Sequence, residues 1–149
     1  MKKIKVLMID DNIALTEMVK EYFKDSSEIE IVECCYNGEE GIKKIDELEG
    51  KYDVILWDLI MPKKDGISVL EDLKERNIHK NIIVETSYNS PEVIRNVSEY
   101  GVNYYILKPF DLPDLEKRIL DIFKSVSKKG INLAHNNLEI SITRMLHEL

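Results

Sequence analysis

Five short apolar runs recur along the chain, and each ends at polar or turn-forming residues. They cover residues 4–9, 29–36, 54–58, 81–86 and 102–107. Runs of this length, bounded by turn signals, are typical of strands buried in a parallel sheet. Between the first two runs, apolar residues recur at helical spacing, at Leu15, Met18, Val19, Tyr22 and Phe23. The pattern therefore predicts strands that alternate with helices.

Polar caps and proline mark where the helices begin. Asp11 or Asn12 is available as the N-cap of the first helix, and Asn37-Gly38 starts a second that closes near Gly50. A third follows Gly66, Ser90-Pro91 starts a fourth, and Asp111 caps a fifth. Five such units predict an α/β fold. We expect a flavodoxin-like, doubly wound (βα)5 domain with a five-stranded parallel sheet in the order 2-1-3-4-5.

Composition narrows the class of protein. The chain has 149 residues, 44% of them hydrophobic, which suits one ordinary globular domain. Its net charge of −7 argues against a surface that binds nucleic acid unaided. Cys34 and Cys35 are adjacent on a strand, so a disulfide between them would be strained and a reducing cytoplasm is expected. The first apolar run is too short for a signal sequence or a membrane span.

Chemically active side chains gather at the ends of the predicted strands. Asp10 and Asp11 follow the first strand, Asp58 ends the third, Thr86 ends the fourth and Lys108 follows the fifth. In the expected strand order the first and third strands are neighbours, so three carboxylates would meet, which like-charge repulsion opposes unless a cation is present. Oxygen ligands in an open cleft suit Mg2+, and Lys108 could balance a phosphoryl group.

Each of these residues alone has a structural explanation. Asp10 and Asp11 could cap a helix, and Asp58 could belong to the turn that leads to Pro62. That all of them fall at one edge of the sheet is a coincidence that neither explanation requires. The shared edge therefore favours a functional site.

The same residues carry a resemblance to a known family. Asp10-Asp11, Asp58 with Met61-Pro62 and Asp65-Gly66, Thr86, and Lys108-Pro109 resemble the receiver domain of two-component response regulators. The resemblance implies that Asp58 is the phosphoacceptor and that Thr86 and Lys108 contact the phosphoryl group. It also implies that Asp11, Asp58 and the backbone carbonyl of Ile60 bind Mg2+ (or another divalent cation such as Mn2+ or Ca2+), with Asp10 acting largely through water. Tyr105 matches the aromatic that rotates inward with the threonine, and the Lys108-Pro109 bond is expected to be cis.

Two positions depart from the commonest receiver pattern. Glu85 stands where an apolar residue is usual, and it places a charge near the fourth strand. Ser87 replaces a frequent alanine, a conservative change because the backbone N–H is the group that the phosphoryl oxygen would use.

The end of the chain indicates a second part. The receiver is expected to cover residues 1–127 and a linker residues 128–136. Residues 137–149 place Leu138, Ile142, Met145, Leu146 and Leu149 on one helical face. Through Leu138, Ile142-Thr143 and His147-Glu148, this tail resembles the opening of the DNA-binding effector domain of sporulation-type transcription regulators.

We therefore expect a phosphorylation-driven signalling switch of a sporulation regulator more than a turnover enzyme. The resemblance implies a histidine kinase or histidine phosphotransferase as phosphodonor, a homodimer on phosphorylation, DNA binding only through the effector domain, and no membrane partner. An alternative is a stand-alone receiver acting as a phosphorelay intermediate, against which the tail argues. An aspartyl-phosphate phosphatase would carry a second acid two residues after the nucleophile, and Asp58 is followed by Leu59-Ile60.

Overall fold

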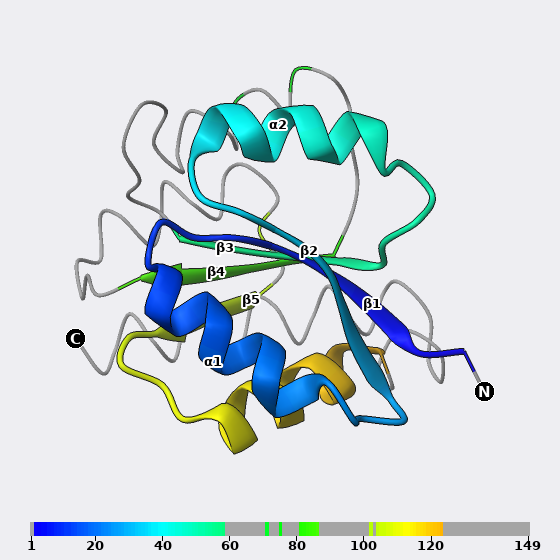
Figure 1. Cartoon of the computed structure of the whole chain (residues 1–149), viewed down its shortest axis with the longest axis vertical. Helices are drawn as coiled ribbons and strands as arrows, with labels where there is room; N and C mark the ends of the chain where they lie inside the picture. Colours follow the sequence, from blue (N-terminus) through cyan, green and yellow to red (C-terminus); the bar gives the residue numbers. More distant parts are fainter. Residues whose placement is uncertain are drawn as a thin grey trace.

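A five-stranded parallel sheet forms the centre of the protein (Figure 1). The computed structural model describes residues 2–58, 71, 75, 81–86, 102 and 104–123. Its strands are β1 (Ile4–Ile9), β2 (Ile29–Cys35), β3 (Val54–Asp58), β4 (Asn81–Thr86) and β5 (Tyr104–Leu107). Their order is β2-β1-β3-β4-β5, and every neighbouring pair is parallel. The predicted strand order and α/β class are confirmed.

Helices lie on both faces of this sheet. Figure 1 shows α2 (Gly38–Glu47) above the sheet, with α1 (Ile13–Phe23) and a helix over residues 112–123 below it. Asn12, and not Asp11, is the N-cap of α1, because its side chain accepts a hydrogen bond of 3.0 Å from Leu15 N. Asn37 caps α2 in the same way through Glu40 N, also at 3.0 Å.

Alternation along the strands divides the core into two clusters. Side chains on one face pack with α2, and they include Trp57, Ile9 and Tyr105. The cluster on the other face packs with α1 and the helix over residues 112–123, through residues that include Met8, Leu56 and Ile83. Successive strand residues point to opposite faces, so each cluster takes every second residue. The same alternation fixes the face on which each strand presents its last residue.

α2 lies unusually close to β1. A Cβ atom built on Gly41 would stand 2.8 Å from Ile9 Cδ1 and 3.0 Å from Ile9 Cγ2. Only glycine allows this approach, and Ile9 is the residue that precedes Asp10. The fit of a helix onto the sheet therefore helps to set the position of the strand end.

The fifth strand is shorter than the sequence predicts. It begins at Tyr104, paired with Ile83, and Val102 lies outside the strand although it is buried. An apolar run indicates that its residues are buried, and it does not by itself distinguish a buried loop residue from a strand residue. Tyr36, the last residue of the predicted second strand, likewise follows the end of β2.

Some predicted elements fall outside the described residues. These are the helix that starts at Ser90-Pro91, the linker at 128–136 and the tail at 137–149, and most of the helix after Gly66, of which Glu71 and Glu75 are described as helical. Among the described residues, no helix is long and apolar enough to cross a membrane.

Candidate phosphoryl-acceptor site

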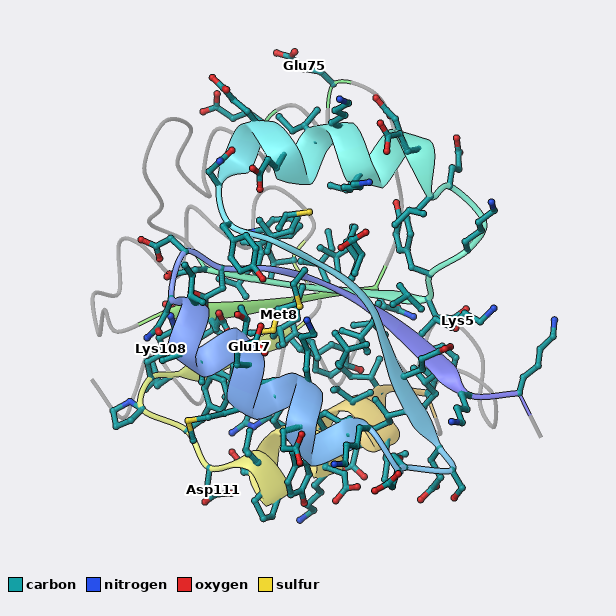
Figure 2. All side chains as sticks on the ribbon, in the orientation of Figure 1. Lys5, Met8, Glu17, Glu75, Lys108 and Asp111 are labelled. Atoms are coloured by element: carbon teal, nitrogen blue, oxygen red, sulfur yellow. The ribbon has the colours of Figure 1, made fainter. Side chains whose placement is uncertain are left out.

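Four neighbouring strands present a charged residue at the same corner of the fold. Asp10 follows β1, Asp58 ends β3, Glu85 is the last residue but one of β4, and Lys108 follows β5. By alternation, each shares the face of an apolar residue two positions earlier, namely Met8, Leu56, Ile83 and Ile106, all in the cluster that packs against α1. Figure 2 shows Lys108 at the edge of the sheet where α1 begins. The local strand geometry thus directs all four side chains to one place.

Asp10 is held by the turn that leads into α1. Its Oδ1 accepts a hydrogen bond of 2.8 Å from Asn12 N, and its own N–H donates to Cys35 O at 2.9 Å. The side chain is fully buried. Burial raises the pKa of Asp10, although the hydrogen bond from Asn12 and the charge of Lys108 act in the opposite direction.

Three carboxylates come together at this corner. Oxygen atoms of Asp10, Asp11 and Asp58 lie within 4.8 Å of one another. The Asp10 side chain is buried, that of Asp58 is partly buried and that of Asp11 is exposed, so the group opens to solvent on one side. A set of carboxylate oxygens in an open cleft is the donor set that Mg2+ takes, since this ion keeps several of its waters. The residues present therefore fit a divalent cation.

Lys108 is the cation of the described site. Its Nζ donates a hydrogen bond of 3.0 Å to Asp58 Oδ2 and lies 2.9 Å from Asp10 Oδ2, an ion pair without hydrogen-bond geometry. Burial lowers the pKa of Lys108, but attraction to Asp10 and then Asp58 outweighs it and leaves the pKa above its ordinary value. Lys108 is therefore charged at neutral pH.

The segment after Lys108 fixes its backbone. The Lys108-Pro109 peptide bond is cis. Asp111 then caps the helix over residues 112–123 by accepting a hydrogen bond of 2.7 Å from Asp114 N. From this helix Arg118 donates a hydrogen bond of 2.9 Å to Tyr105 O, which ties the helix to β5.

The remaining predicted residues divide into two groups. Tyr105 is 4% exposed and lies in the core cluster on the α2 side of the sheet, so its ring is buried in this state. Thr86 closes β4 and pairs with Leu107. Its side chain, together with Ile60, Met61-Pro62, Asp65-Gly66 and Ser87, lies outside the described residues.

Glu85 is the site residue that the sequence did not identify. It is fully buried, and its Oε1 lies 3.7 Å from Lys108 Nζ. Its sequence neighbours suggest only a charge near the strand end. The available signal was the alternation, because Glu85 stands two residues after Ile83 and therefore on the face of Asp58 and Lys108.

Comparison with known proteins establishes the family. The model of the response regulator receiver domain matches residues 6–120, and the chain belongs to this family. It is 31% identical over 141 residues to the transcriptional regulatory protein CiaR of Streptococcus pneumoniae, an alignment that covers 94% of this chain and 61% of that protein. It is 32% identical over 139 residues to the probable C4-dicarboxylate response regulator DctR of Halalkalibacterium halodurans, covering 91% of this chain and 59% of the relative.

A solved structure agrees with this assignment. The receiver domain of the Francisella response regulator 1452 superimposes with a TM-score of 0.72 at 30% identity, over 82% of this chain and 98% of that one. The chain spans about three fifths of the length of the two curated relatives. Receiver domains are signalling switches that generally bind Mg2+ at an acidic pocket and receive phosphate from histidine kinases, and a cluster of aspartates is present here.

Proposed function

We propose that the chain accepts a phosphoryl group on Asp58 from a phosphohistidine of a histidine kinase or histidine phosphotransferase. One observation carries the proposal: Asp58 Oδ2 lies 3.0 Å from the ammonium of Lys108, beside the carboxylates of Asp10 and Asp11. A nucleophile, a cation and a divalent-metal donor set thus share one corner.

Each of these groups has its own role in the transfer of the phosphoryl group. A carboxylate oxygen of Asp58 attacks phosphorus, the phosphorus–nitrogen bond of the phosphohistidine breaks, and the imidazole leaves with the bonding electron pair. Lys108 then contacts an oxygen of the phosphoryl group that is now bound to Asp58. Mg2+ would be held by Asp11, Asp58 and the carbonyl of Ile60, with Asp10 acting largely through water, and it would neutralise charge on the phosphoryl oxygens.

Phosphorylation of Asp58 would change the conformation of the rest of the molecule through Thr86 and Tyr105. The Thr86 hydroxyl would donate a hydrogen bond to a phosphoryl oxygen, and the movement of Thr86 would vacate space into which the buried ring of Tyr105 moves further. We infer a switch whose output is dimerisation through the face formed by the helix starting at Ser90-Pro91, β5 and the helix over residues 112–123.

The domain plan supports a transcription regulator. We propose a receiver over residues 1–127, a linker over 128–136 and the start of a DNA-binding domain over 137–149. The tail residues favour a regulator of the type of stage 0 sporulation protein A, and the name of CiaR supports the broader class. The two free cysteines support a cytoplasmic localisation of the protein. The reading frame past Leu149 tests this plan, because a stand-alone receiver would lack a DNA-binding domain there.

Replacing the nucleophile tests the central proposal. Asp58→Asn should take up no phosphate from a phosphorylated histidine phosphotransferase, because the amide is not nucleophilic. Radiolabel per mole of protein is the measurement, and Asp25→Asn, an exposed carboxylate of the loop after α1, is the control that should label fully. Unchanged stoichiometry in a cooperatively folded Asp58→Asn would refute the assignment.

A further inference from the structure

Glu85 is a fully buried acidic residue inside the site, and the functions proposed above do not use it. It pairs in register with Asp58 across β3 and β4. Its side chain is fully buried, like that of Asp10, whereas 19% of the Lys108 side chain is exposed. The position of Glu85 adds a third acidic side chain to those of Asp10 and Asp58 around Lys108.

The surroundings of Glu85 are poor for a carboxylate. Neither of its oxygens has a hydrogen-bond partner within the part of the chain that the structure describes. Among the described residues it forms an ion pair with Lys108 Nζ at 3.7 Å, longer than the 2.7–2.9 Å of a good charge-assisted hydrogen bond. A buried charge with no hydrogen bonds is expensive, and an apolar residue of similar volume would generally be cheaper. Packing therefore does not account for the carboxylate.

Electrostatics gives it a role. Within the described part of the chain, the Lys108 ammonium faces three carboxyl groups, those of Asp10 at 2.9 Å, Asp58 at 3.0 Å and Glu85 at 3.7 Å. Attraction to Glu85 pulls Lys108 toward β4 and competes with any anion that arrives at Asp58. An attraction across 3.7 Å in a buried site is hardly screened by solvent.

We propose that Glu85 is a positioning residue that holds the Lys108 ammonium back from the phosphoryl group and so lowers the affinity of the site for that group. The proposal rests on the proposed function, since it assumes that Lys108 contacts a phosphoryl group on Asp58. Glu85 acts on this affinity only through the position of Lys108, and it does not itself touch the phosphoryl group.

Beryllofluoride, which mimics a phosphoryl group on aspartate, tests the proposal in the full chain with Mg2+. Glu85→Gln keeps the size of the side chain and removes its charge, so its affinity for beryllofluoride should rise about tenfold. Glu85→Asp keeps the charge but withdraws it from Lys108 by one methylene, so its affinity should lie between those of the wild type and Glu85→Gln. The 19F NMR signal of bound beryllofluoride gives the affinities, and Glu30→Gln, an exposed glutamate on β2, should match the wild type.

The outcomes separate the two proposals. Equal affinities of wild type and Glu85→Gln for beryllofluoride would overturn the role of Glu85. It would also be overturned if Glu85→Gln bound more tightly while Glu85→Asp bound like the wild type, because the affinity would then depend on the charge alone and not on its distance from Lys108. If Glu85→Gln does not unfold cooperatively, Glu85→Leu replaces it, with the same expected gain. A wild type that binds no more beryllofluoride than Asp58→Asn would instead refute the proposed function.

Discussion

Asp10 has one oxygen in a turn and the other against an ammonium, and its burial connects the site to the pH dependence of folding. Its pKa is raised in the folded state, mainly by burial. A carboxyl whose folded pKa is raised binds its proton more tightly when folded. Its contribution to stability is therefore complete below the unfolded value of 3.8 and is lost as the pH rises through the folded pKa.

Asp10→Asn tests this sign. In protein freed of metal by a chelator, the free energy of unfolding of Asp10→Asn minus that of the wild type should increase as the pH rises from about 4 toward neutrality. Urea denaturation at a series of pH values gives the difference, with Asp25→Asn as the control for loss of a surface charge. A difference that stays flat or falls over this range would contradict the burial of an ionised Asp10.

At the scale of elements, the contact of α2 with β1 links a helix to the acidic corner. Gly41→Ala should destabilise the protein by up to roughly 2 kcal/mol. The overpacking against Ile9 costs ~1–3 kcal/mol, which exceeds the gain of up to ~1 kcal/mol in helix propensity. Thermal and urea unfolding measure the change, and Lys43→Ala, exposed on the same helix, should stay within about 0.5 kcal/mol of the wild type. A more stable Gly41→Ala would mean that Ile9 moves aside freely.

The elements also show what the sequence could predict. The strand order, the helix caps at Asn37 and Asp111, and the convergence of Asp10, Asp58 and Lys108 follow from periodicity and turn chemistry, which are local. The start of β5 and the choice of Asn12 over Asp11 depend on which backbone groups have partners in space. Burial of Glu85 was not predictable from its charge, because a charged residue is almost never fully buried unless it is paired, and the partner, Lys108, follows a different strand, β5.

For the whole molecule, phosphorylation and assembly should be separable. A hydrogen bond from Thr86 to a phosphoryl oxygen contributes ~1.5–3 kcal/mol, enough to shift a two-state equilibrium roughly tenfold to a hundredfold if it forms in one state only. Beryllofluoride with Mg2+ should therefore drive the wild type to dimers, whereas Thr86→Ala should bind the mimic and remain monomeric.

Sedimentation velocity of both proteins, with and without the mimic, measures this coupling. Asp58→Asn with the mimic serves as the control for assembly that does not depend on the acceptor. Equal dimer populations in the wild type and Thr86→Ala under all conditions would exclude the proposed route from Thr86 to the dimer face.

Trp57 gives the protein a built-in optical probe. It is the only tryptophan in the chain, it is fully buried, and it directly precedes Asp58 on β3. Its indole Nε1 has no hydrogen-bond partner among the described residues, and its neighbours in the core on the α2 side include Ile9, Val84 and Tyr105. The tryptophan emission of the protein therefore comes from a single apolar environment, on the face of the sheet opposite the carboxylates. A change in its wavelength or intensity on phosphorylation would report movement of the strand and of Tyr105, without any attached dye.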